Sequence, residues 1–470
     1  MILKFKHIVI LAIVMLTSSC SESFLDINPE QSVAAESAVV DLVTLQTALY
    51  GTYSKLQNND YYGRTMYIIP ELMADNLYLS SRNTGRYLEY ENFVVSERNG
   101  EAEGLWEKGY EVIANATRAI EGGKAIEGST PTGQISINQL IGEAYALRAL
   151  AHFDLVRMFA QPYNFTADAS HLGIPVISEV NTVQTSPSRN TVKEVYTQIN
   201  NDLTAALGLM QTQKGKGSFS IGAVKGLLAR VALYQDDEAN AIKYSSEVIT
   251  TGGYTLITNN NYATLWSSEL NNETLFEVVN TIADSEGSNS LGHFFSVSGY
   301  ADALVSTELY NLYDSEDVRK TAITSGAKPS AETDALFVNK FPKGTAADDN
   351  IKILRLAEQY LIRAEAYVKE GENTLAQNDL NVILKRANPN APNAIETGSD
   401  LLNRILEERR KELAFEGHRL FDLNRNKKDV KIIQSEKSIT VSYPNDKFIL
   451  PIPLKEINSN PNIKPQNTGY

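Results

Sequence analysis

The chain has 470 residues, of which 43% are hydrophobic, and this length is enough to bury a large core. Its formal net charge of -14 argues against nucleic acid or an anionic lipid surface as the main partner, because both require a basic protein surface. The single cysteine excludes an internal disulfide bond and any zinc site built from several cysteines.

The N-terminal segment predicts an export signal that ends at a lipid attachment site. Lys4 and Lys6 precede an apolar run at 8–16 that is too short to span a bilayer, and small residues lead up to Cys20. This order resembles the bacterial lipobox, in which the cysteine is lipidated and becomes the mature N-terminus. Thr17 departs from the pattern, since leucine is usual at its position. An ordinary secretory signal with an incidental cysteine is the alternative.

Three parts of the chain follow from this interpretation. We predict a lipoprotein signal peptide at 1–19, a lipidated flexible tether at 20–36 and a single folded domain at 37–470. No segment of the domain is long and apolar enough to cross a membrane. The mature protein is therefore expected to be held at the membrane by its lipid.

Apolar residues at helical spacing predict helices along most of the domain. They are expected at 38–57, 105–121, 138–159, 192–210, 221–234 and 237–250, and again at 351–369 and 374–387. Arg148, Arg230 and Arg363 each stand beside small residues in the first helix of a predicted pair, where a second helix can pack closely. Pairs of about 34 residues with this pattern are typical of tetratricopeptide repeats, and unrelated helical hairpins are the alternative.

Two regions depart from the helical pattern. Residues 58–104 combine tyrosines with glycines and scattered arginines, and we expect this region to be ordered, irregular and surface-lying. Residues 251–349 contain short strands expected at 254–257 and 275–279, followed by a glycine- and serine-rich loop at 285–300. Loops of this composition are functional more often than chance. The helical repeats are expected at about 37–57, 105–250 and 351–425.

The stretch at 401–425 places a charge on the apolar face of a predicted helix. Arg409 falls on this face, and a buried guanidinium needs anionic partners to offset its lost hydration. Glu412 and Glu416 lie further along the same face, so we expect both to pair with Arg409. Gly417 is expected to end the helix, because glycine is common just past a helix C-terminus.

No motif of a known catalytic or metal site is found. The sequence has no HExxH, no GxxxxGK[ST] phosphate loop and no GxSxG. With only five histidines a His-rich metal site is not expected, and His152 and His418 are expected to pack within helices. The acidic pair Glu407 and Glu408 is interpreted as partner to the neighbouring arginines, not as a catalytic pair.

Four segments, together with the lipobox, resemble the hallmarks of the SusD/RagB family of nutrient-binding outer-membrane lipoproteins of Bacteroidetes, in their usual order. They are EAYALRALAHFDLVRMFAQPY at 143–163, RAEAY at 363–367, EERRKELAFEGHRLFDLNR at 407–425 and LPIPLKEINSNPNIKPQNTGY at 450–470. The combination spans nearly the whole chain. The resemblance implies an all-α dominated, SusD-like fold, in which a tetratricopeptide-like helical repeat scaffold carries an irregular, loop-rich insertion with short strands.

The resemblance also implies a function. Members of this family sit on a SusC-like TonB-dependent transporter and capture oligosaccharides, or peptides in some branches, without catalysing a reaction. We therefore expect a cell-surface lipoprotein, anchored in the outer membrane through its lipid, that binds oligosaccharide or polysaccharide and delivers it to such a transporter. No enzymatic activity, cofactor or metal is predicted. A peptide-capturing RagB-like lipoprotein and a tetratricopeptide protein-interaction scaffold are the alternatives, and a secreted hydrolase ranks last.

Candidate ligand-binding residues come from two stretches, 75–92 and 285–300. Sugar recognition needs aromatic faces beside carboxylates, amides and guanidinium groups, and both stretches supply this mixture. The family resemblance implies that 58–104 and 251–349 are variable and bind ligand, and it places ligand contacts in the same two stretches. The predicted ligand-binding residues are Asp75, Tyr78, Arg82, Arg86, Tyr87, Phe295 and Tyr300. Trp106 and Trp266 lie on helix-spaced apolar patterns and are expected in the core.

Overall fold

The computed structural model describes residues 39–126, 128, 130–180, 185–215, 217–434 and 437–470. The predicted signal peptide at 1–19, and the tether at 20–36 with its lipidation site Cys20, lie outside the described residues. Within the described ranges, no helix combines the length and the apolar character that crossing a membrane requires.

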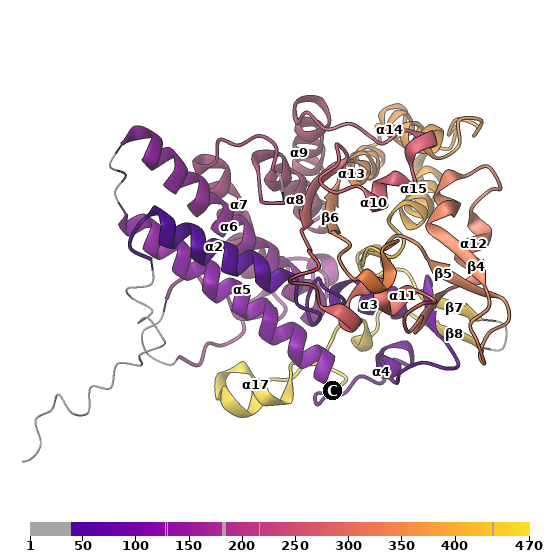
Figure 1. The fold of residues 1–470 in the computed structure, drawn as a ribbon, viewed down its shortest axis with the longest axis horizontal. Coiled ribbons are helices and arrows are strands. Elements are labelled where there is room, and N and C mark those ends of the chain that lie inside the picture. Colours follow the sequence, from indigo (N-terminus) through magenta and orange to yellow (C-terminus); the bar gives the residue numbers. More distant parts are fainter. Residues whose placement is uncertain (1–38, 127, 129, 181–184, 216, 435–436) are drawn as a thin grey trace, which may run out of the picture.

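Helices dominate the described part of the chain (Figure 1). The longer ones are α2 (Leu42–Leu56), α5 (Gly100–Ala125), α6 (Pro131–Phe159), α7 (Val192–Leu209), α8 (Ile221–Tyr234), α9 (Glu238–Thr251), α13 (Leu356–Lys369), α14 (Asn373–Ala387) and α15 (Gly398–Leu413). The shorter ones are α3 (Thr65–Leu72), α4 (Leu88–Glu91), α10 (Thr264–Ser267), α11 (Leu291–Phe295), α12 (Thr307–Leu312), α16 (Arg419–Arg425) and α17 (Leu454–Ser459). The predicted fold class, helix-dominated with short strands, is confirmed.

Short strands occur in antiparallel pairs outside the helical scaffold. They are β1 (Leu77–Leu79) with β3 (Ala303–Val305), β2 (Thr274–Val278) with β6 (Ile351–Arg355), β4 (Ile323–Gly326) with β5 (Ala335–Val338), and β7 (Val430–Gln434) with β8 (Lys437–Val441). In Figure 1, α2, α5, α6 and α7 lie together at one side of the molecule, and β4, β5, β7 and β8 lie at the other. Because β1 pairs with β3, the two variable regions lie side by side.

Capping residues explain where several helices begin. Asp41 exchanges hydrogen bonds with Thr44 at the start of α2, and a Thr-Glu capping box opens α7 in the same way. The side chain of Thr130 caps α6, and Pro131 occupies the first helical position, where a missing N–H costs nothing. These two residues make α6 begin at Pro131 and not at the predicted 138.

Ion pairs with little exposure join helices that pack together. Arg148 of α6 donates two hydrogen bonds to Asp202 of α7, at 2.8 and 2.7 Å. Arg363 of α13 donates two hydrogen bonds to Asp379 of α14, both at 2.7 Å. The arginines that the sequence places on packing faces therefore act as bridges between helices, and each bidentate pair fixes the orientation of two helices.

The predicted helix at 351–369 is partly wrong. Its first five residues form β6, which pairs with β2, and α13 starts only at Leu356. Every residue of β6 is buried, so its apolar residues do not alternate and give the same pattern as a buried helix. The described residues contain no strand at 254–257, so that prediction is wrong as well. The strand predicted at 275–279 is confirmed as β2.

The prediction that 58–104 lies on the surface is also wrong. α3 is buried along its whole length, and most tyrosines of the region are in the core. Hydrogen bonds make this burial possible, since Tyr61 donates to Asp154 and Tyr67 donates to the carbonyl of Lys352, both at 2.6 Å. The region therefore fills the centre of the fold and reaches the surface mainly through the loop after β1.

Arg409 is buried as predicted, but its partners differ from those expected. Its Nε donates to Asp422 at 2.8 Å, and its Nη2 lies 3.3 Å from Glu358. Neither Glu412 nor Glu416 pairs with it. The guanidinium points across α15 toward α16 and α13, so its anionic partners come from neighbouring helices and not from its own.

Glu412 and Glu416 instead pair with basic residues of other elements. Arg355 of β6 contacts both, at 3.1 and 2.8 Å, while Arg386 of α14 lies 2.6 Å from Glu412 and Lys340 lies 2.6 Å from Glu416. All of these side chains are buried. Charge thus fixes β6, α14 and the segment after β5 to α15 and to the turn that follows it, and the second variable region is attached to the scaffold at this point.

The pairing predicted for Glu407 and Glu408 is wrong too. Glu408 is buried and contacts Arg319 at 2.5 Å and Lys411 at 2.8 Å. Glu407 is partly exposed and, among the described residues, pairs with Arg404 alone, at 3.1 Å. The interpretation of both glutamates as ion-pair partners agrees with these contacts, although the arginines differ.

The turn after α15 also departs from expectation. The helix ends at Leu413, and both Phe415 and Gly417 have positive φ, at 68° and 76°. In this conformation the backbone N–H groups of Phe415, Gly417 and His418 donate to the buried carboxylate of Glu71, at 3.1, 3.0 and 3.1 Å. Gly417 therefore shapes a turn that binds α3, and it does not mark the end of the helix.

Glu365 of α13 gives the fold a testable pH dependence. Arg425 of α16 donates two hydrogen bonds to it, at 2.5 and 2.8 Å. Burial raises the pKa of Glu365, but the charge of Arg425 outweighs burial and holds this pKa at about 2. Because an unfolded glutamate titrates near ~4.3, the pair stabilises the fold above that pH. This contribution is lost as the pH falls through the folded-state value.

We expect Glu365→Gln to remove the pH-dependent contribution of this ion pair to the free energy of unfolding. The free energy of unfolding, measured by urea titration at a series of pH values, should then fall less steeply than in the wild type between about pH 4.3 and the folded-state pKa. Identical slopes in the two proteins would show that the pKa of Glu365 is the same in the folded and unfolded states.

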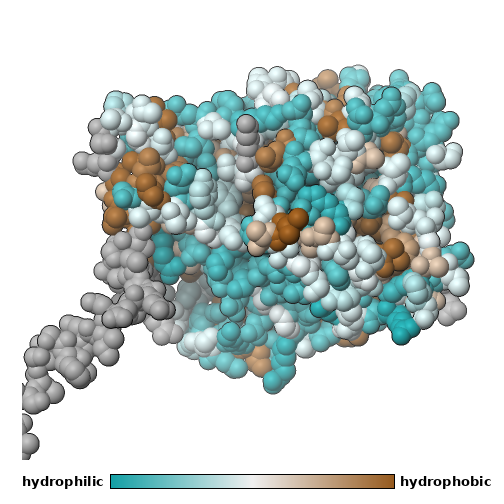
Figure 2. All heavy atoms as spheres, in the orientation of Figure 1, coloured by the Kyte–Doolittle hydropathy of each residue, from teal (hydrophilic) through white to brown (hydrophobic). Residues whose placement is uncertain are grey.

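Hydrophilic side chains cover most of the face of the molecule shown in Figure 2. Apolar side chains gather at the left of this view, around the N-terminal end of α2, where Val40 and Val43 are among the exposed residues. The remaining exposed apolar residues on the described surface are scattered, as is normal for a folded domain.

Candidate functional site

Loops from the two variable regions meet at one surface. The first follows β1, and the second runs from 285 to 300 and leads into β3. The antiparallel pairing of β1 with β3, in which Tyr78 lies opposite Leu304, holds the bases of both loops together. Tyr78 itself is half-buried against the small apolar cluster around Leu304 and Phe337. The two variable regions therefore form one continuous surface to which a ligand could bind.

Charged side chains hold the first loop in place. Glu332 accepts hydrogen bonds from the two serines that follow β1, at 2.8 and 2.7 Å. Lys328 donates to the carbonyl of Arg82 at 2.6 Å, and Asp302 accepts from the backbone and hydroxyl of Thr84. The side chain of Arg82 remains exposed. The loop is thus fixed through its backbone, which leaves its longer side chains free to point outward.

Buried aromatic rings hold the second loop. Phe295 of α11 stacks on Phe341 with ring centroids 5.7 Å apart and an interplanar angle of 12°. Phe294 meets Tyr87 edge to face, at 5.6 Å and 88°. Since Tyr87 belongs to the first loop, this contact joins the two loops beneath the surface.

Four partly exposed side chains lie above these rings: Arg86, Asn289, His293 and Tyr300, here called the Arg86–Tyr300 cluster. The guanidinium carbon of Arg86 lies 4.9 Å from the centroid of the Tyr300 ring, and the His293 ring lies 4.5 Å from it. Nη2 of Arg86 is 3.5 Å from Oδ1 of Asn289. An aromatic ring, a guanidinium, an imidazole and an amide therefore share one surface.

Positive charge influences this cluster. A hydrogen bond with Ser288 lowers the pKa of Tyr300, and the guanidinium of Arg86 lowers it further. Below the cluster, Arg64 donates from Nε to the hydroxyl of Tyr87 at 2.9 Å. Burial raises the pKa of Tyr87, so this phenol stays neutral and acts as an acceptor for Arg64.

The structure separates the predicted site residues into four groups, of which Asp75 alone forms the last. Arg86 and Tyr300 are in the cluster, and Tyr78 and Arg82 lie on the adjoining strand and loop. Tyr87 and Phe295 are 2% and 1% exposed and lie beneath the cluster. The cluster also contains Asn289, which the sequence did not single out. An asparagine in a serine-rich loop carries no distinguishing signal, and only its position between two arginines identifies it.

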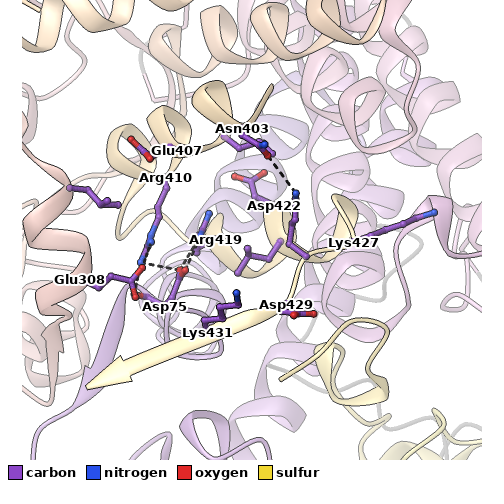
Figure 3. A pocket seen from close by; sticks show the side chains of 14 residues that line it. Asp75, Glu308, Asn403, Glu407, Arg410, Arg419, Asp422, Lys427, Asp429 and Lys431 are labelled. Atoms are coloured by element: carbon purple, nitrogen blue, oxygen red, sulfur yellow. Dashed lines mark hydrogen bonds and ion pairs between the residues drawn. The ribbon is translucent and has the colours of Figure 1, made fainter. Parts of the chain in front are cut away.

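Asp75 lies elsewhere, in the wall of a cavity of about 530 Å³ (Figure 3). Its carboxylate accepts two hydrogen bonds from Arg419, at 2.6 and 2.7 Å, and lies 3.3 Å from Arg410. Burial raises the pKa of Asp75, but Arg419 and Arg410 outweigh burial and lower it. Asp75 therefore stays ionised, and in Figure 3 it joins the side chains of α15 and α16 at one edge of the cavity.

Both tryptophans pack in the core, as predicted. Trp106 is 5% exposed and contacts Phe159 edge to face at 4.9 Å. Trp266 is 7% exposed, and the ammonium of Lys340 lies 4.3 Å from its ring. Both rings are nearly buried, although Trp106 lines part of a second cavity of about 460 Å³.

His152 and His418 are packing residues. His152 is buried in α6, with Nδ1 3.1 Å from the carbonyl of Arg148, and burial lowers its pKa to about 3. Burial likewise lowers the pKa of His418. In the part of the chain that the structure describes, no three His, Cys, Asp or Glu side chains gather in a way that could hold a metal ion.

Family models match both ends of the chain. The model described as "SusD family" matches residues 335–470, and the one described as "Starch-binding associating with outer membrane" matches residues 23–233. Together they include α15 and α16 as well as the first loop of the site. The second loop of the site lies between the two matches.

Similar proteins extend over nearly the whole chain. A solved structure of a Bacteroides vulgatus protein is 34% identical, with 92% of this chain and 99% of that chain covered and a TM-score of 0.84. A SusD superfamily protein from the same organism is 30% identical, with the same coverage and TM-score. The curated SusD-like protein P2 of Formosa agariphila is 25% identical over 97% of this chain and 98% of its own length. The chain therefore belongs to the SusD family.

Proposed function

We propose that this protein is a cell-surface lipoprotein of the outer membrane that binds oligosaccharide or polysaccharide and delivers it to a SusC-like TonB-dependent transporter. Membership of the SusD family supports this proposal, as does the match to a family described as starch-binding and associated with the outer membrane. The proposal includes lipidation at Cys20, a single tetratricopeptide-like domain at 37–470 and no catalytic activity.

One observation supports this location of the binding site, namely that Arg86 and His293 both contact the partly exposed ring of Tyr300. A sugar ring packs its apolar face on an aromatic ring, while its hydroxyls need hydrogen-bond donors and acceptors at the rim. The guanidinium, the imidazole and the amide of Asn289 provide these groups. We place the ligand on this cluster, with Arg82 and Tyr78 at its edge.

The buried predicted residues have a different part in the proposal. Tyr87 and Phe295 position the two loops that carry the cluster, and their contribution to binding is indirect. Asp75 is held by Arg419 and Arg410 in a separate cavity. Direct contact of Asp75 with ligand remains a prediction from the family resemblance.

Replacing Tyr300 with alanine should weaken glycan binding about tenfold, because the aromatic contact is lost while the buried anchors of the loop remain. Isothermal titration calorimetry with a panel of oligosaccharides measures this change. Tyr50→Ala is a matched control, since Tyr50 is an exposed tyrosine of α2. Both variants should melt at the wild-type temperature.

Two results would contradict the proposal. If Tyr300→Ala and Tyr50→Ala bind glycan equally, the site lies elsewhere on the molecule. If no oligosaccharide or polysaccharide binds and peptides co-purify with the protein, the alternative of a peptide-capturing lipoprotein is correct. Mass spectrometry of the purified protein detects such peptides.

A further inference from the structure

Three arginines at the Arg86–Tyr300 cluster have no carboxylate partner. Among the described residues, no Asp or Glu oxygen lies within 4.0 Å of a guanidinium nitrogen of Arg64, Arg82 or Arg86. Arginines of the scaffold such as Arg148 and Arg363 each hold a carboxylate in a bidentate pair. The site therefore differs from the scaffold in the way its positive charge is balanced.

Arg64 and Arg86 converge on a single neutral acceptor. Nη1 of Arg64 lies 3.4 Å from Oδ1 of Asn289, and Nη2 of Arg86 lies 3.5 Å from the same atom. An amide oxygen accepts hydrogen bonds but carries no net charge. Asn289 thus contacts both guanidinium ions without neutralising either, while the charges of Asp60 and Glu286 act on the inner one, Arg64. The outer guanidinium, Arg86, is the one left to pair with an incoming anion.

The guanidinium of Arg86 is also incompletely bonded. Its Nη1 is buried without a hydrogen-bond partner in the described structure, and its guanidinium carbon lies 4.9 Å from the centroid of the Tyr300 ring. A donor that is shielded from water and unpaired costs free energy, which an incoming acceptor would recover. Since the side chain as a whole is partly exposed, a small rotation would present this donor edge to a ligand.

The carboxylates closest to the two loops are engaged elsewhere. Asp302 binds Thr84, and Glu332 binds the serines after β1. Burial raises the pKa of Glu286, and the charge of Arg64 opposes this rise. None of them forms an ion pair with Arg82 or Arg86 among the residues described. The outer face of the cluster thus keeps its positive charge for a ligand.

We infer that the ligand of this cluster is an acidic glycan, with a carboxylate or sulfate group that pairs with Arg86. This inference rests on the proposed function and narrows it to a substrate class. A guanidinium presents two parallel N–H donors that match the two oxygens of a carboxylate or sulfate, and such charge-assisted bonds are stronger than those to a hydroxyl. Tyr300 then packs on the sugar ring, while Arg82 and Asn289 lie within the same surface.

Calorimetry on the full folded chain tests this with matched ligands. The uronate arm compares oligogalacturonate and alginate oligosaccharides with their methyl-esterified forms, and the sulfate arm compares sulfated oligosaccharides with their desulfated forms. The acidic member of at least one pair should bind about tenfold or more tightly than its neutral counterpart. Its affinity should also fall when the salt concentration is raised, as expected for a partly exposed ion pair.

Variants of one residue show whether the cluster is responsible. Arg86→Gln should abolish the preference for the acidic member of the pair, and Arg86→Lys should keep part of it, because lysine retains the charge without the planar fork. Arg118→Gln is the matched control. Arg118 is an exposed arginine of α5 whose guanidinium bonds only to Asn115 among the described residues, at 3.2 Å. Melting temperatures confirm that each variant is folded.

Two outcomes would contradict the inference or the proposed function, and a third would identify the acidic group. If neutral and acidic members bind equally, or if Arg86→Gln leaves the preference unchanged, the inference is wrong and the proposed function stands. If no glycan of either kind binds to the wild-type protein, the proposed function fails, and the inference fails with it. A preference confined to one arm identifies the group as carboxylate or as sulfate.

Discussion

Replacing Glu412 with alanine is expected to lower the free energy of unfolding by about 3–5 kcal/mol, the range found when one member of a buried ion pair is removed. Glu412 is buried and lies 3.1 Å from Arg355, 2.6 Å from Arg386 and 3.5 Å from Arg319. Without it, three guanidinium ions would remain in a region that water does not reach. Urea denaturation followed by circular dichroism measures the loss.

Glu407→Ala is the matched control on the same helix. The Glu407 side chain is 42% exposed and, in the part of the chain that the structure describes, pairs only with Arg404, which is itself partly exposed. Exposed pairs of this kind contribute between about 0 and 1 kcal/mol, so Glu407→Ala should change stability little. Equal losses in the two variants would show that burial of the charges on α15 is not what stabilises the fold.

The second large effect is expected for Gly417→Ala, which should lower the free energy of unfolding by about 3 kcal/mol. Gly417 has a φ of +76°, and an added Cβ would lie 2.5 Å from the carbonyl oxygen of Met66 and 3.2 Å from Cα of Tyr67. The substitution therefore adds a backbone clash to the cost of a left-handed conformation. The clash also pushes the turn away from α3, to which it is bonded through Glu71.

Gly371→Ala separates these two costs. Gly371 has a φ of +83°, but an added Cβ there would meet no atom within 4 Å. Only the left-handed conformation is penalised, at about 1–2 kcal/mol. If Gly417→Ala is no more destabilising than Gly371→Ala, the contact between the turn and α3 gives way readily and contributes little.

Helix periodicity was sufficient for most of the scaffold, and the failures have a physical cause. α8 coincides with the predicted 221–234, because its apolar face and its boundaries are both marked in the local sequence. β6 was mistaken for the start of a helix because it is buried on both sides. A strand of this kind lacks the alternation that distinguishes it, and its partner β2 lies far away in the sequence.

Charge pairing was less predictable than helix position. The position of Arg409 on a buried face follows from spacing along α15, but its partners Asp422 and Glu358 belong to other helices. Spacing within one helix allowed Glu412 and Glu416, and it contains no information about the arginines that approach from β6 and α14. Ion pairs between distant segments depend on the tertiary fold and become visible only with it.

The candidate site, too, could be predicted from the sequence only in part. Arg86 and Tyr300 were singled out because aromatic and arginine residues in irregular loops are typical of binding surfaces. Tyr87 and Phe295 have the same composition signal but lie below the surface. Aromatic residues both anchor loops and contact ligands, and the sequence does not distinguish the two uses. The burial of each side chain in the structure distinguishes the two uses. The structure also shows that Asp75 lines a separate cavity.

The paired rings Phe294 and Phe295 have a consequence for how specificity can change. They fasten α11 through Tyr87 and Phe341, while His293 beside them and Tyr300 beyond them point to the outer face. The loop is therefore anchored by buried residues, while its exposed residues are not needed to hold it in place. Substitution of these exposed residues alone would change which ligand is bound. The stability of the helical scaffold would be unaffected, because the buried anchors of the loop are kept.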